Sequence, residues 1–190
     1  ISCGQRAAAG AIERVRIDPE SLAVRYRVIG SELWSDESGF EAAIAATGVT
    51  GICGSGIIEA VAEMYLSRVL TADGVINETQ AARTDRIIKD GRTCSFVLTA
   101  GESHIVVTQT DVRQIQLAKA ALYAGVKLLM DEFPVTRVDR IRIAGAFGSN
   151  IDPRHAMVLG LIPDCELANV SSIGNAASTG VRIALLNTDC

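Results

Sequence analysis

The sequence has 190 residues, of which 48% are hydrophobic and only 4% aromatic, and its formal net charge at neutral pH is -4. An acidic chain lacks the overall positive field that would hold nucleic acid or an anionic membrane surface, so neither is expected as a partner. The length allows one substantial core. Abundant alanine, isoleucine, valine and glycine with few aromatic residues are typical of helices packed closely on a sheet, which predicts an α/β fold.

The ends of the chain, its cysteines and its most apolar window suggest the setting of the protein. The first residue is Ile1 and no initiator methionine precedes it, so we expect a fragment of a larger protein. The apolar window 42–66 contains Glu59 and Glu63 and does not have the composition of a membrane span. Scattered cysteines without a C-x-x-C pair predict reduced, buried thiols in a cytoplasmic protein rather than a metal or disulfide set. These cysteines are Cys3, Cys53, Cys94, Cys165 and Cys190.

Two alternating runs, 11–17 and 22–28, flank the turn sequence Asp18-Pro19-Glu20-Ser21 and predict a β-hairpin. The polar face of this hairpin is either an ordinary solvated face or a docking surface for another protein. That face carries Arg14, Arg16, Arg25 and Arg27.

A first glycine turn, Thr50-Gly51-Ile52-Cys53-Gly54-Ser55-Gly56, precedes a predicted helix over 57–70. Ser55 is a candidate N-cap, and Gly54, Ser55 and Gly56 could contact a phosphate or ribose. Equally, Gly54 and Gly56 could allow the helix to pack tightly on the sheet. Both interpretations stay open.

The segment 71–109 has the polar character of an insertion, with two strands predicted over 95–99 and 104–108 as a second hairpin. His104 at the start of the second strand is expected at the surface. A long helix then follows over 112–132, with Asp111 and Gln114 spaced as a capping box.

The most informative stretch is 138–153, because it combines a strand, a glycine turn and a helix start. Ile141 and Ile143 alternate with arginines as in a half-buried strand, and Asp152 before Pro153 predicts an N-cap with proline at the first helical position. Such a junction favours anions and is a common nucleotide site, although glycines also simply turn the chain. A short helix is expected over 153–160, and a last one runs from the junction 174–177 to about residue 186.

Several of these segments together resemble the reductive activators of corrinoid-dependent methyltransferases. The resemblance rests on residues 2–7, 10–12, 50–58, 114–121, 143–152, 160–163 and 174–177. It implies the C-terminal lobe of an ATPase of the acetate and sugar kinase, chaperone and actin superfamily, with a mixed sheet and flanking helices over 1–190.

By the same resemblance, the adenosine loop would comprise Gly145, Ala146, Phe147, Gly148, Ser149 and Asn150, with Gly54, Ser55 and Gly56 as a second nucleotide contact. Ala146 stands where the wider superfamily often has a second glycine. No catalytic or metal-binding residue is expected in this chain, because the family's phosphate loops and cluster cysteines are absent from it.

The implied function is that of the nucleotide-binding lobe of an ATP-dependent activator, which reduces inactive cobalt(II) corrinoid proteins of a methyltransferase system. ATP with Mg would be shared with a missing lobe, and the iron–sulfur cluster would lie in a missing N-terminal part. The chain alone is expected to be inactive. Two alternatives are an interaction module that docks a corrinoid protein or forms a homodimer, and the lobe of a small-molecule kinase.

Overall fold

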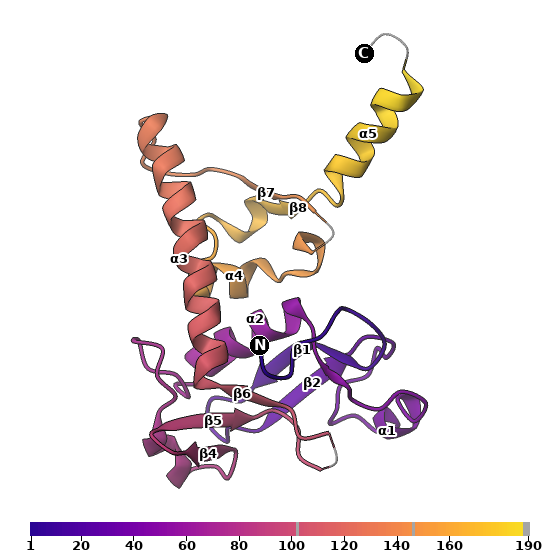
Figure 1. Ribbon diagram of the computed structural model, residues 1–190, viewed down its shortest axis with the longest axis vertical. Coiled ribbons are helices and arrows are strands. Elements are labelled where there is room, and N and C mark those ends of the chain that lie inside the picture. The colour runs from indigo at the N-terminus through magenta and orange to yellow at the C-terminus, as the bar shows by residue number, and fades with distance from the viewer. Residues whose placement is uncertain (102, 146, 188–190) are drawn as a thin grey trace. The chain divides into compact units, whose positions relative to one another are not determined.

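The computed structural model describes residues 1–101, 103–145 and 147–187 (Figure 1). The chain divides into two compact units, Ile1–Ala121 and Leu122–Cys190. Each unit has its own sheet structure and is considered by itself. The single lobe over 1–190 stays a prediction.

The first unit opens with a mixed sheet of three strands in the order β2-β1-β3. Strands β1 (Ala11–Ile17) and β2 (Val24–Val28) form the predicted hairpin, with Val15 opposite Tyr26, while β3 (Gly51–Ile52) runs parallel to β1. Strand β2 begins later than predicted, because Leu22 takes a left-handed conformation with φ 58° as part of the turn. A short helix, α1 (Phe40–Ala43), which the sequence did not indicate, lies between β2 and β3.

Helix α2 (Gly54–Leu66) packs against β1 and differs at both ends from the predicted range 57–70. Cys53 is the N-cap residue and makes no side-chain capping bond. The prediction that Ser55 caps this helix is therefore wrong: Ser55 lies buried in the first turn, because the helix already begins at Gly54. The helix ends early because Arg68 adopts φ 63° and the Ser67 hydroxyl donates to the Glu63 carbonyl.

Two glutamates of α2 complete the hydrogen bonding of β1 beyond the end of the short strand β3. The backbone N–H of Val15 donates to Oε2 of Glu59 at 3.1 Å, and that of Ile17 donates to Oε2 of Glu63 at 3.0 Å. A buried backbone N–H needs such a partner, so the two carboxylates replace a missing strand neighbour. The polar interruptions of the apolar window 42–66 are therefore structural.

The insertion-like segment forms an antiparallel sheet of its own in the order β4-β5-β6. Strands β5 (Thr93–Val97) and β6 (Val106–Thr108) confirm the second predicted hairpin, with Phe96 opposite Val107. The sequence did not indicate strand β4 (Ile87–Asp90), because Ile87 and Ile88 are adjacent rather than alternating and polar residues surround them. The short helix η1 (Glu78–Ala82) precedes β4, and His104 is exposed as expected.

Helix α3 (Gln109–Glu132) begins earlier than predicted, and its capping box lies one turn upstream. The Thr108 hydroxyl accepts from the backbone N–H of Asp111 at 3.1 Å, and Oδ2 of Asp111 accepts from the backbone N–H of Thr108 at 2.9 Å. Asp111 is thus the acidic partner of a Thr108 cap, and the predicted pairing of Asp111 with Gln114 is wrong. The pattern T-x-x-D at 108–111 and the pattern D-x-x-Q at 111–114 both have capping-box spacing, and the structure uses the first.

The second unit contains two parallel strands, β7 (Ile141–Ile143) and β8 (Val170–Ser172), with Ile141 opposite Val170 and Ile143 opposite Ser172. The turn η2 (Gly148–Asn150) and helix α4 (Pro153–Leu159) follow β7, and the turn η3 (Leu167–Asn169) precedes β8. Helix α5 (Ala176–Leu186) ends the described chain. Within the described residues, no helix combines the length and apolarity that crossing a bilayer requires.

The predicted start of α4 is confirmed in detail. The Asp152 side chain accepts hydrogen bonds from the backbone N–H groups of Arg154 at 2.8 Å and His155 at 3.3 Å, and Pro153 occupies the first turn. Gly160 closes the helix with φ 71°. The strand, glycine turn and helix predicted over 138–160 are therefore present in that order.

Candidate functional site

The carboxyl ends of β7 and β8 form the edge at which the glycine loop lies. Gly145 follows β7 and Gly174 follows β8, and the N–H of Gly145 donates to the carbonyl of Gly174 at 2.7 Å. Gly145 has φ 106°, and a Cβ built on it would meet no described atom within 4 Å. The backbone of Gly145 therefore borders open space, at the kind of sheet edge where α/β proteins bind ligands.

The loop after Gly145 presents one aromatic side chain and folds back on its own backbone. Phe147 is 55% exposed. Ser149 donates to the carbonyl of Gly145 from both its N–H, at 3.2 Å, and its hydroxyl, at 3.1 Å. Asn150 continues the turn, with its N–H donating to the carbonyl of Phe147 at 3.1 Å. Ala146 lies outside the described residues.

Gly148 has a different role from Gly145. It is buried, and a Cβ built on it would lie 2.5 Å from Cγ2 of Ile143. The absence of a side chain at Gly148 thus lets the loop pack on the end of β7, whereas the absence of one at Gly145 leaves space open.

Helix α5 begins beside the same loop. The Asn175 side chain caps it by accepting from the N–H of Ser178 at 3.1 Å. Free backbone N–H groups and the positive end of the helix dipole favour an anion at such a position. One edge of the second unit therefore combines an open glycine, an exposed aromatic ring and a helix start.

The second predicted contact, Gly54, Ser55 and Gly56, lies in the first unit at the start of α2. A Cβ on Gly56 would lie 2.2 Å from the carbonyl oxygen of Ile12, which is shorter than any tolerable contact. Ser55 is buried, with its hydroxyl oxygen 3.2 Å from Sγ of Cys53. These contacts support tight packing of the helix on the sheet, the structural alternative left open by the sequence.

The arginine-bearing hairpin face is largely neutralised by carboxylates. Arg14 and Arg16 both donate to the buried Glu59, at 2.6 and 2.5 Å, and Arg27 pairs with Glu13 at 3.2 Å. A positively charged docking surface would need cations that are not already paired. The contacts therefore explain these arginines through the fold and give no support to the docking alternative.

The ring of Trp34 lies against two arginines of the same hairpin face. The guanidinium groups of Arg16 and Arg25 lie 5.7 and 4.9 Å from the centre of its ring. These distances are within the range of cation–π attraction. The ring thereby holds two neighbouring arginines of the hairpin in place.

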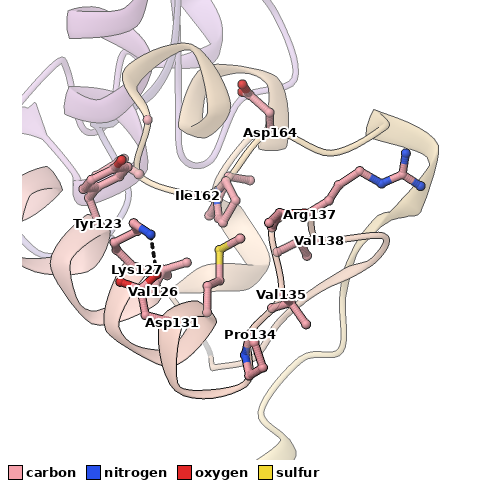
Figure 2. Close-up of a pocket in the computed structure, with 15 residues that line it drawn as sticks. Tyr123, Val126, Lys127, Asp131, Pro134, Val135, Arg137, Val138, Ile162 and Asp164 are labelled. Atoms are coloured by element: carbon pink, nitrogen blue, oxygen red, sulfur yellow. Dashed lines mark hydrogen bonds and ion pairs between the residues drawn. The ribbon is translucent and has the colours of Figure 1, made fainter.

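A pocket of about 760 Å³ also lies in the second unit, away from the glycine loop (Figure 2). The segment 134–138, which lines the pocket, precedes β7, whereas Gly145 follows β7. The pocket and the glycine loop therefore lie at opposite ends of this strand. Apolar side chains of α3 and of the segments on either side of α4 line most of it, including Val126, Met130 and Ile162. The sequence did not indicate this pocket, because its walls come from three separate segments.

The two cations that line this pocket are each paired with a carboxylate. Lys127 bonds Asp131, and this hydrogen bond raises the pKa of Lys127 above its usual value. Arg137 bonds Asp139 at 2.7 Å, which likewise raises the pKa of Arg137. The pocket therefore combines an apolar wall with paired cations, and Asp164 is a further carboxylate at its edge.

The cysteines that the structure describes are free thiols. Cys53 and Cys94 are buried, while Cys3 and Cys165 are partly exposed, and Cys190 lies outside the described residues. Among the described residues, no three cysteines come together as a ligand group. This part of the chain therefore does not fit an iron–sulfur cluster.

Comparison with known proteins shows the family of this chain. The family model described as the C-terminal domain of RACo, the ASKHA domain, matches residues 1–190. The chain belongs to this family. The ASKHA domain described here is also 34% identical over 201 residues to the corrinoid activation enzyme RamQ of Eubacterium limosum, covering 100% of this chain and 31% of that protein.

The structure of this ASKHA domain is similar to that of a solved protein, a reductive activator for corrinoid, iron-sulfur protein. The TM-score is 0.79 at 32% identity, and the match covers 98% of this chain and 28% of that chain. The ASKHA domain thus spans about three-tenths of the length of both relatives. These findings confirm the resemblance and the mixed α/β fold of an actin-like lobe that the sequence predicted.

Proposed function

We propose that this ASKHA domain is the nucleotide-binding lobe of an ATP-dependent activator that reduces inactive cobalt(II) corrinoid proteins to the cobalt(I) state. The observation that carries the proposal is the match along the whole chain to an activation enzyme and a reductive activator for corrinoid proteins. The open glycine edge of the second unit gives the proposal a physical site.

The loop at that edge suits a nucleoside better than it suits a catalytic centre. Gly145 borders open space, and Phe147, two residues further along the loop, has an exposed aromatic side chain on which a base could stack. In this proposal, Gly145, Ala146, Phe147, Gly148, Ser149 and Asn150 contact the adenosine part of ATP. The role of Gly54, Ser55 and Gly56 in nucleotide binding stays a prediction, and the packing of Gly56 gives that residue a structural reason of its own.

The aspartates near the informative segments support an activator rather than a small-molecule kinase. Phosphoryl transfer to a substrate hydroxyl needs a carboxylate base beside the γ-phosphate. Asp111 instead belongs to the capping box of α3, Asp152 caps α4, and Asp139 bonds Arg137. Each carboxylate thus has a partner within its own part of the fold.

The remaining components belong to the full-length protein in this proposal. Mg would accompany ATP between this lobe and a second one, and the iron–sulfur cluster that supplies the electron would be bound outside this chain, since the described cysteines do not fit it. We place the activator in the cytoplasm, as part of a methyltransferase system whose corrinoid protein is its partner. A homodimer stays an open prediction.

The test is the substitution Phe147→Ala in the full-length protein, with Phe133→Ala as the matched control. Both rings are exposed, 55% for Phe147 and 69% for Phe133, so neither change should alter folding. Stacking of a base on an aromatic ring is worth about 1–3 kcal/mol. Phe147→Ala should therefore weaken MgATP binding, measured by calorimetry, by about 5-fold or more.

The same two variants should differ in corrinoid reduction at limiting ATP. Cobalt(I) formation in the partner protein, followed by absorption spectroscopy with a reductant present, should slow in Phe147→Ala and stay unchanged in Phe133→Ala. Equal ATP affinity and equal rates in both variants would show that the loop does not hold the nucleotide. Cobalt(I) formation that is independent of ATP in the wild type would contradict the activator function itself.

A further inference from the structure

Four hydrogen bonds form a closed ring at the carboxyl ends of the parallel strands β7 and β8. The Gly145 N–H donates to the Gly174 carbonyl at 2.7 Å, and the Gly174 N–H donates to Oγ of Ser172 at 3.3 Å. The Ser172 hydroxyl then donates to Oγ of Ser149 at 3.1 Å, and the Ser149 hydroxyl donates to the Gly145 carbonyl at 3.1 Å. Each hydroxyl donates once and accepts once, so the ring is complete and internally consistent.

Ser172 is the member of this ring that is best placed to hold the others. It is the last residue of β8 and is paired in register with Ile143, the last residue of β7. Ser149 lies in the short turn η2, which has fewer backbone constraints than a strand. The hydroxyl of Ser172 therefore connects the short turn η2 to the end of the sheet.

We propose that Ser172 is a positioning residue for the nucleotide loop, although it lies outside the loop and outside every segment that carries the resemblance. This inference rests on the proposed function, since it deepens the role of the same edge. Ser172 would not touch the nucleotide. It acts through Ser149, whose hydroxyl holds the Gly145 carbonyl and so keeps the open glycine in one conformation.

The physical reason is pre-organisation. A loop that is held in its binding conformation loses less conformational freedom when the ligand arrives, and so binds more tightly. Removing the Ser172 hydroxyl deletes one hydrogen bond to Ser149 and leaves the Gly174 N–H without its side-chain acceptor. The loss of a hydrogen bond of this kind corresponds to about a 3- to 10-fold change in an equilibrium constant.

The neighbouring Ser171 provides the matched control. It is also an exposed serine of β8, but its side chain points to the other side of the strand and makes no hydrogen bond with any residue in the described ranges. Ser171→Ala thus removes the same atom from the same strand without breaking the ring. Ser172→Thr keeps the hydroxyl and suits a strand, so it serves as the conservative variant.

The experiment measures MgATP affinity by calorimetry in the full-length protein, for the wild type and these three variants. We expect Ser172→Ala to weaken binding by about 3- to 10-fold, with Ser172→Thr and Ser171→Ala close to the wild type and all melting temperatures alike. Ser149→Ala combined with Ser172→Ala should cost little more than either alone, because both break one ring. Equal affinity in Ser172→Ala and Ser171→Ala would overturn the proposal.

A second readout separates this inference from the proposed function. Amide hydrogen exchange in the nucleotide-free protein should become faster at Gly145 and Gly174 in Ser172→Ala, but not in Ser171→Ala. A wild type that binds no MgATP would contradict the proposed function and the positioning role together. If the wild type binds MgATP and exchange at both amides is unchanged in Ser172→Ala, only the positioning role is wrong.

Discussion

The buried carboxylate of Glu59 should be the most sensitive single side chain in the first unit. It accepts hydrogen bonds from Arg14 Nη1 at 2.6 Å, Arg16 Nη1 at 2.5 Å and the Val15 N–H at 3.1 Å, and it is 0% exposed. The substitution Glu59→Ala would leave two guanidinium groups without this partner and a buried backbone N–H unsatisfied. Removing one partner of a buried ion pair costs about 3–5 kcal/mol.

The exposure of the arginines places the expected value near the lower end of that range. The side chains of Arg14 and Arg16 are 26% and 33% exposed, so water can partly solvate both after the carboxylate is gone. We therefore expect a loss of about 3 kcal/mol in the free energy of unfolding. Glu59→Gln, which keeps an acceptor for Val15, should lose less than Glu59→Ala.

Urea unfolding followed by the fluorescence of Trp34 measures this effect in the relevant unit. Trp34 is the single tryptophan of the chain and stacks with Arg16 and Arg25 in the first unit. A loss of about 3 kcal/mol should lower the urea midpoint by about 1 M or more.

Glu78→Ala is the control, because Glu78 pairs with Lys89 at 2.7 Å while both side chains are 60% and 61% exposed. Such a surface pair contributes about 1 kcal/mol or less. If Glu59→Ala shifts the midpoint no further than Glu78→Ala, then the buried carboxylate does not hold α2 on β1.

Two further predictions concern the first unit. Burial alone would raise the pKa of Asp111, but hydrogen bonds from Thr108 and Ser2 outweigh it and hold this pKa below its usual value. A depressed pKa means that the ionised Asp111 stabilises the fold above pH about 4 and that this contribution is lost as pH falls further. Asp111→Asn should therefore lower the free energy of unfolding by about 1 kcal/mol at neutral pH, and the difference should shrink at pH about 3; urea midpoints that differ equally at both pH values would contradict this. Gly56→Ala should destabilise the unit by about 1–3 kcal/mol or more, because its Cβ would lie 2.2 Å from the Ile12 carbonyl oxygen. Calorimetric melting is the measurement, and an unchanged melting temperature would rule out the packing role.

The sequence by itself determined the features that depend on local chemistry. Alternation over 11–17 predicted β1, and Asp152 before Pro153 predicted the start of α4, because strand period and helix capping involve only neighbouring residues. The glycine junction at 145–150 was located in the same way. The resemblance to the family came from several different segments spread along the whole chain, and the match of the family model over residues 1–190 confirms it.

Only the tertiary structure decided what each glycine and each polar residue does. Gly56 and Gly148 look alike in the sequence to Gly145, but atoms of other elements exclude a side chain at both of them. At Gly56 the atom belongs to Ile12 of β1, far away in the sequence, and at Gly148 it belongs to Ile143, at the end of the strand before the loop. Local patterns cannot reveal such neighbours.

The same reason explains the features that the sequence missed. Glu59 interrupts an apolar helix in sequence but completes the hydrogen bonds of a strand that lies some forty residues earlier. Ser172 is one serine among several until the parallel pairing of β7 and β8 brings it beside Ser149. Packing and hydrogen bonding between separate segments are decided by which surfaces meet, and that is settled only when the strands and helices have paired.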